Sequence, residues 1–160
     1  MALTQGAWTQ QVVGTGKYQV WKCNVAFTTA ENDAYTLKTP DTLDTTKAWA
    51  LAVVPAATAD GQALPVDMWC GYKSDFALSG DSTTVAATSG FEFKTIIDDA
   101  SAATARLVLM DPNATQADVV AVATGGLRVK PPIFPYYAFN LDGGSTLNAT
   151  NVDFYIIQHA

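Results

Sequence analysis

Short apolar runs, separated roughly every ten residues by Gly, Pro, Asp or Asn, constrain the fold of this chain most strongly. In residues 18–29, Trp21, Cys23, Val25 and Phe27 alternate with polar or small residues. This period of two is typical of a strand with one buried face. We therefore predict a mainly β protein, an antiparallel β-sandwich or jelly-roll-like barrel of about 8–10 short strands.

Similar signals delimit the other strands that we expect. They lie at residues 8–13, 35–37, 49–54, 66–72, 106–110, 119–124, 127–129, 136–141 and 152–158. The glycine-containing loop 14–16 predicts a hairpin of the first run with residues 18–29, and Gly125-Gly126 predicts a second hairpin. The cluster of Pro131, Pro132 and Pro135 indicates a sheet edge or an irregular extended passage.

One short helix is expected at residues 94–105. Ile96, Ile97, Ala100, Ala103 and Thr104 recur at the three- and four-residue spacing of a helix face. No repeat and no composition shift marks a second domain, so residues 1–160 are expected to form a single β domain.

Residues 1–8 are a candidate N-terminal arm of this domain. Trp8 follows a polar segment that could lie across a neighbouring subunit, where an aromatic anchor would contribute binding energy. The alternative is that Trp8 packs on its own sheet.

Side chains that carry acid–base chemistry or bind metals are scarce. The one histidine, His159, is the last residue but one, where a chain end is expected to fray. The two cysteines, Cys23 and Cys70, are expected to be free thiols buried in strands, and a disulfide formed in an oxidising medium is the alternative. We therefore expect no enzyme activity, no catalytic residues, no cofactor and no metal site.

Two groups of oxygen-bearing side chains resemble parts of calcium sites. Asp41, Asp44 and Asp142 lie in expected loops and could join a structural Ca²⁺ site across subunits, although their spacing does not require one. Residues 111–115 place oxygen donors as the start of a calcium loop does, but Gln116 and Val122 occupy the positions that need Gly and Glu. A turn is therefore expected there.

The charge of the chain limits its partners. The formal net charge is −6 and only 15% of the residues are charged, whereas nucleic-acid-binding proteins present a basic stripe. No run approaches the ~18 apolar residues of a membrane span, and the N-terminus lacks the pattern of a signal peptide. We expect synthesis in the cytoplasm, with neither nucleic acid nor membrane as partner. A weakly charged surface suits lasting contacts with other subunits.

Several segments together resemble small virion proteins of tailed bacteriophages. They are residues 6–9 (GAWT), 27–40 (FTTAENDAYTLKTP), 65–72 (PVDMWCGY) and 135–148 (PYYAFNLDGGSTLN). The resemblance implies a structural component of the particle. Within particles, an acidic all-β chain rich in Thr, Ala and Gly best fits a capsid decoration or cement protein, which binds and stabilises the outer capsid shell.

This resemblance implies the major capsid protein and copies of the chain itself as partners, such proteins often being trimers, and the outer capsid surface of the virion as location. The first alternative is a neck, tail or fibre component. The second is a carbohydrate-binding or hydrolytic β-sandwich that uses Trp and Tyr faces together with aspartates.

Overall fold

The computed structural model describes residues 4–11, 16–27, 34–55, 65–80, 84–97, 105–114, 127–142 and 150–160. All regular elements in these ranges are strands: β1 (Thr4–Gln5), β2 (Thr9–Gln11), β3 (Tyr18–Phe27), β4 (Ala34–Lys38), β5 (Trp49–Pro55), β6 (Val66–Gly71), β7 (Ala77–Gly80), β8 (Val85–Thr88), β9 (Gly90–Ile97), β10 (Arg106–Met110), β11 (Leu127–Val129), β12 (Tyr136–Asp142) and β13 (Thr150–His159). The prediction of a mainly β fold is confirmed.

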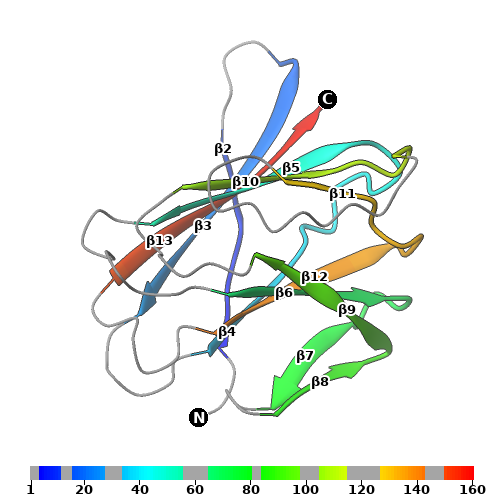
Figure 1. Cartoon of the computed structure of the whole chain (residues 1–160). Coiled ribbons are helices and arrows are strands. Elements are labelled where there is room, and N and C mark those ends of the chain that lie inside the picture. Colours follow the sequence, from blue (N-terminus) through cyan, green and yellow to red (C-terminus); the bar gives the residue numbers. More distant parts are fainter. Residues whose placement is uncertain are drawn as a thin grey trace.

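The strands form two main sheets. One has the order β1-β4-β12-β6-β9 and the other the order β11-β10-β5-β13-β3-β2. Most neighbouring strands are antiparallel, and neither sheet closes into a barrel. Figure 1 shows the two layers, with β5, β10 and β13 in the upper one and β6 and β12 in the lower one. The architecture is that of a β-sandwich.

The core lies between the two sheets. Alternate residues of each strand enter it, as the period of two requires. The six-stranded sheet contributes Trp21, Cys23, Val25, Phe27, Trp49, Leu51, Val108, Phe154 and Ile156, and the five-stranded sheet contributes Leu37, Met68, Cys70, Tyr137, Phe139 and Leu141. Both cysteines are therefore buried and free, as predicted.

A hairpin covers part of the other face of the five-stranded sheet. Strands β7 and β8 pair with each other and lie below β6 and β12 in Figure 1. Phe76 and Leu78 pack there against Ala138, with Trp69 and Tyr136 beside them. The middle of this sheet is thus buried on both faces.

The helix expected at residues 94–105 is contradicted where the structure describes it. Residues 94–97 belong to strand β9, which pairs antiparallel with β6. Thr95, Ile96 and Ile97 are three consecutive β-branched residues, which favour a strand over a helix. Residues 98–104 lie outside the described residues, and Ala105 directly precedes β10.

The two predicted hairpins have different outcomes. Strands β2 and β3 pair antiparallel, with Gln10 opposite Trp21, so the first hairpin is confirmed on either side of residues 12–15. Leu127–Val129 instead pairs in parallel with β10. The strand expected at residues 119–124 and the glycines 125 and 126 lie outside the described residues.

The N-terminal segment connects the two sheets. β1 adds in parallel to β4 of the five-stranded sheet, and β2 then joins the six-stranded sheet. Between them, Trp8 packs against the core and its Nε1 donates a hydrogen bond of 2.6 Å to the carbonyl of Lys38. Trp8 therefore packs on its own domain, which was the alternative to an anchor on a neighbouring subunit.

Candidate protein-docking surface

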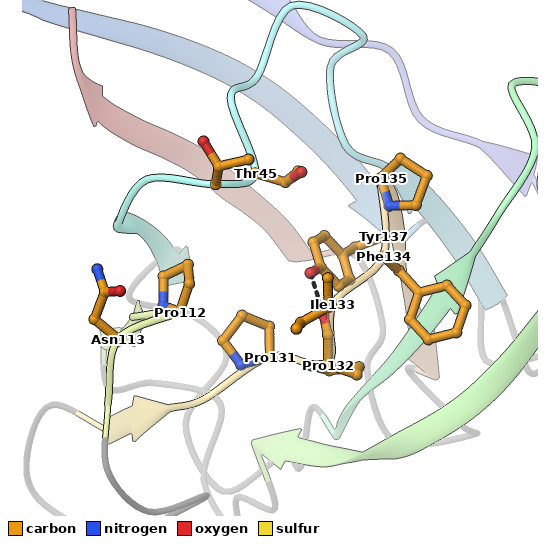
Figure 2. A pocket seen from close by; sticks show the side chains of 10 residues that line it. Thr45, Pro112, Asn113, Pro131, Pro132, Ile133, Phe134, Pro135 and Tyr137 are labelled. Atoms are coloured by element: carbon orange, nitrogen blue, oxygen red, sulfur yellow. Dashed lines mark hydrogen bonds between the residues drawn. The ribbon is translucent and has the colours of Figure 1, made fainter.

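A cavity of about 490 Å³ opens at one end of the sandwich and is lined mainly by rigid apolar residues. Its wall combines three segments: the loop before β5, the turn after β10, and the passage between β11 and β12. The lining residues are Thr45, Thr46, Pro112, Asn113, Pro131, Pro132, Ile133, Phe134, Pro135 and Tyr137. Figure 2 shows the prolines arranged around the cavity, with the ring of Tyr137 among them.

Tyr137 holds the proline segment in place. Its hydroxyl donates a hydrogen bond of 2.5 Å to the carbonyl oxygen of Pro132, drawn as a dashed line in Figure 2. Its ring is buried in the core, and this burial raises the pKa of the Tyr137 hydroxyl to about 12. The hydroxyl therefore stays protonated as a donor across the physiological range.

The turn that carries Pro112 is fixed by Asp111. The backbone N–H of Asp111 donates to the carbonyl of Val129, and the Asp111 carboxylate accepts from the backbone N–H of Asn113. Arg128 forms an ion pair with the same carboxylate, and this contact holds the pKa of Asp111 below its usual value. Residues 111–114 form the expected turn, which the carboxylate orders, and Thr115 lies outside the described residues.

A row of aromatic rings leads away from the cavity. The ring centroids of Phe134 and Phe91 are 5.9 Å apart, and those of Phe91 and Tyr72 are 6.2 Å apart. These distances lie within the range of favourable aromatic contacts. The rings come from three separate places in the sequence: the proline segment, strand β9 and the residue that follows β6.

Two rings of the row, Phe91 and Tyr72, and the neighbouring Ile133 are open to solvent, whereas Phe134 packs partly against the core. Ile133 is fully exposed, Phe91 is 57% exposed and Tyr72 is 52% exposed. Contiguous exposed apolar side chains of this kind mark protein–protein contacts more often than isolated ones do. We call Tyr72, Phe91, Ile133, Phe134 and the prolines of the cavity the proline–aromatic end.

Cationic side chains lie near this end although the chain is acidic overall. The Nζ of Lys73 lies 5.8 Å from the centroid of the Tyr72 ring. Lys130 is exposed beside Pro131 in the sequence, and Arg128 is exposed next to the turn at Asp111. An apolar centre with a charged rim is the usual anatomy of a protein interface.

The remaining candidate residues are held in local contacts. His159 is not frayed, since it pairs with Tyr18 at the end of the β13–β3 ladder and its ring centroid lies 4.5 Å from that of Tyr18. Cys23 and Cys70 lie on opposite sheets, and burial raises the pKa of both thiols. None of these three residues lines the cavity.

Two of the three aspartates considered for a calcium site make contacts with residues close to them in the sequence. Asp41 forms an ion pair with Lys38, and Asp44 accepts hydrogen bonds from the N–H and hydroxyl of Thr46. The side chain of Asp142 lies outside the described residues. Within the described ranges, no group of three or more His, Cys, Asp or Glu residues could hold a metal ion.

The proline–aromatic end was not predicted as a surface from the sequence. Its prolines predicted only a sheet edge or an irregular extended passage, and neither Phe91 nor Tyr72 was predicted to lie in a binding surface. The one available signal was the segment PPIFP at residues 131–135, where Ile and Phe stand among prolines. Large apolar side chains in a segment that cannot form a central strand have a raised chance of facing solvent or a partner.

Comparisons with known proteins add little. No protein-family model matches the chain, and no curated protein matches it in sequence. A solved structure, described as CorA, a surface-associated copper-binding protein important in Methylomicrobium album BG8 copper acquisition, is similar over 99% of this chain and 98% of that chain. The identity is 8% and the TM-score 0.38, which supports no conclusion about function. Among the described residues, no helix is long and apolar enough to cross a membrane.

Proposed function

We propose that this chain is a structural virion protein of a tailed bacteriophage, which binds the outer capsid shell and stabilises it as a decoration or cement protein. The observation that carries the proposal is the proline–aromatic end, where Ile133, Phe91 and Tyr72 are exposed together beside an apolar cavity. The resemblance of the sequence to small phage virion proteins supplies the kind of partner.

The proline–aromatic end suits lasting attachment to a protein lattice. Proline rings have fixed backbone angles and aromatic rings have few rotatable bonds, so little conformational entropy is lost when they become ordered against a partner. Aromatic side chains are also enriched among the residues that contribute most binding energy. The lysine side chains at the rim, Lys73 and Lys130, would favour an acidic patch on the major capsid protein.

Stabilisation of the shell would follow from mass action. A ligand that binds the mature, expanded lattice and not the immature one stabilises the former in proportion to its occupancy and affinity. The chain would need no catalytic group for this task.

Copy number is the decisive test of the role within a particle. Quantitative mass spectrometry of purified particles would compare this chain with the major capsid protein. A ratio near one, or a simple fraction set by shell symmetry, is expected for a decoration protein. A few copies per particle would indicate a neck, tail or fibre component, and absence from particles would refute the virion proposal.

The role of the proline–aromatic end in binding can be tested by a substitution that introduces a single charge. Ile133→Lys places an ammonium group at the centre of the proline–aromatic end, at a fully exposed position where the fold should tolerate it. We expect binding to expanded shells to weaken at least tenfold in a co-sedimentation assay, with unchanged circular dichroism. Ala86→Lys, at an exposed site on β8, is the matched control. Equal binding of both variants and the wild type would exclude this surface.

A further inference from the structure

Another cavity, of about 380 Å³, lies beside the N-terminal segment and is walled by tryptophan and by hydrogen-bonding side chains. Trp8 and Gln10 come from the N-terminal segment, and Asp41 and Thr42 come from the turn that follows β4. Figure 1 shows the N-terminal segment crossing from the lower layer to the upper one. The volume lies near the lower end of the range of small-molecule sites. We call this cavity the tryptophan cleft.

The strand register explains why two indole rings meet at this cleft. Gln10 on β2 lies opposite Trp21 on β3, so the two side chains share the inner face of the six-stranded sheet. Trp21 is only 4% exposed and closes the cleft on the side of the core. Trp8 is half-buried and leaves part of its ring open to solvent. Trp8 therefore supplies a flat aromatic wall that a ligand can reach.

The positions of both walls are fixed by hydrogen bonds within the chain. The Nε1 of Trp8 donates a bond of 2.6 Å to the carbonyl of Lys38, which holds the plane of the indole ring. The N–H and the hydroxyl of Thr39 both donate to the carbonyl of Tyr137, at 2.8 and 3.1 Å. A site that is already formed loses less conformational entropy when a ligand binds.

A turn presents the polar groups of the second wall. The N–H of Leu43 donates a bond of 3.0 Å to the carbonyl of Pro40, so Asp41 and Thr42 are the two central residues of the turn. Both are exposed, as is Gln10. A carboxylate accepts hydrogen bonds, whereas a hydroxyl and an amide both donate and accept them. The cleft thus combines an aromatic wall with exposed donors and acceptors.

The charged residues that line the cleft are one lysine and one aspartate, and they form an ion pair. The Nζ of Lys38 lies 3.3 Å from Oδ1 of Asp41. The same ammonium group donates a bond of 2.7 Å to the carbonyl of Ser74 and lies 5.0 Å from the centroid of the Tyr136 ring. In a chain of net charge −6, a lysine that is neutralised in this way does not favour an anionic ligand. The electrostatics of the cleft therefore suit a neutral ligand.

We propose that the tryptophan cleft binds a neutral saccharide, as a mono- or disaccharide unit. A pyranose ring with equatorial hydroxyls has axial C–H bonds on its flat faces, and these suit the electron-rich face of the Trp8 indole. Its hydroxyls, at the edge of the ring, donate and accept hydrogen bonds as Gln10, Asp41 and Thr42 require. A purely apolar ligand would remove these groups from water without giving them partners.

The inference does not depend on the proposed function. None of the residues that line the tryptophan cleft lines the cavity of the proline–aromatic end. Binding of a saccharide and binding to a capsid shell can therefore succeed or fail separately.

An NMR titration of the purified, ¹⁵N-labelled full chain tests the proposal, with cellobiose, maltose and lactose as probes. The four tryptophans give four assignable indole N–H signals. We expect at least one probe to shift the Trp8 signal in a saturable way, with a Kd on the order of 1 mM. The signals of Trp49 and Trp69, which do not line the cleft, should stay in place. Glycerol, which has hydroxyls but no ring face, should shift none of the four at the same concentration.

Two substitutions test the polar groups without removing the buried tryptophan. Gln10→Ala and Asp41→Ala change exposed side chains, and each should weaken binding about three- to tenfold, as expected for the loss of one hydrogen bond. Thr9→Ala, on the opposite face of the same strand, and Asp75→Ala, an exposed aspartate outside the cleft, are the matched controls and should bind as the wild type does.

Three outcomes would overturn the proposal. The first is the absence of a saturable shift of the Trp8 signal with every probe up to about 50 mM. The second is equal affinity of the wild type, Gln10→Ala and Asp41→Ala for the probe that binds. The third is a glycerol-induced shift as large as that caused by the disaccharides, which would mean that the ring face is not recognised.

Discussion

At the scale of single residues, Tyr137 and Gln158 show how buried polar groups fix surface loops. The Tyr137 hydroxyl binds the carbonyl of Pro132 and so ties the proline segment to the core. The Gln158 amide bonds reciprocally to the backbone of Asp44, with Nε2–O and Oε1–N distances of 2.6 and 3.0 Å. Each side chain forms a hydrogen bond with a backbone group of a loop. Without this bond, the backbone group would exchange its hydrogen bonds to water for no partner when the chain folds.

Tyr137→Phe should lower stability and change its dependence on pH. Loss of the hydroxyl leaves the Pro132 carbonyl without this donor, at a cost of about 1–2 kcal/mol near neutral pH. Burial raises the pKa of Tyr137 from 10.0 to about 12. Because the folded-state pKa lies above the unfolded value, the tyrosine's contribution is complete below pH 10 and is lost as the pH rises towards 12.

Urea unfolding at several pH values between neutral and alkaline would measure this effect. The wild type should lose more stability than Tyr137→Phe as the pH rises above 10, so the two curves should converge. Tyr72→Phe, at an exposed position, serves as the control and should follow the wild type. Parallel curves for the wild type and Tyr137→Phe would contradict the prediction.

At the scale of elements, the N-terminal segment acts as a brace between the two sheets. β1 extends one sheet, β2 extends the other, and the N–H of Gly6 between them donates a 2.8 Å hydrogen bond to the carbonyl of Thr36. Trp8 lies within this short passage and packs on the core. A segment that binds both layers contributes to the stability of the isolated domain.

Trp8→Ala should therefore destabilise the isolated chain by about 2–3 kcal/mol, through lost burial and the lost hydrogen bond to Lys38. Thermal and urea unfolding would measure the change. Gln10→Ala, an exposed position on the same segment, should shift stability by less than about 0.5 kcal/mol. An unchanged unfolding midpoint for Trp8→Ala would mean that this tryptophan serves a contact outside the domain.

At the scale of the whole molecule, the two thiols report on the integrity of the sandwich. Cys23 belongs to β3 of one sheet and Cys70 to β6 of the other, and each is only 3% exposed. Burial raises the pKa of both groups, so the reactive thiolate is scarce as well as shielded. A reagent reaches either sulfur only when the layers open.

We expect an aromatic disulfide reagent to label neither thiol of the native chain quickly at pH 8 and both in denaturant. The native rate should be at least about 100-fold below that of an exposed cysteine. Ala86→Cys supplies that reference in the same chain. Rapid labelling of one native thiol would show that one sheet opens locally without global unfolding.

The local sequence pattern was enough to predict much of the fold, but little of the candidate docking surface. The alternation from Trp21 to Phe27 located β3 and its buried face, and it also predicted the burial of Cys23. The spacing of Ile96, Ile97 and Ala100 predicted a helix, and this prediction is wrong for residues 94–97. Three consecutive β-branched residues, Thr95 to Ile97, favour the strand that the structure has there. The proline–aromatic end was not predicted, since Tyr72, Phe91 and Phe134 are distant in sequence and share no periodic pattern.

The sequence by itself determined the all-β class, most strand positions and the burial of the two thiols. It did so because an apolar side chain at every second residue determines which face of a strand is buried. Tertiary structure alone decided which strands are neighbours. It placed Pro112 beside the proline segment and Leu109 beside Ala50, contacts that join distant parts of the chain. Strand pairing is set by how whole faces pack across the core, and residues exposed on the outside of that packing leave no signal in the local pattern.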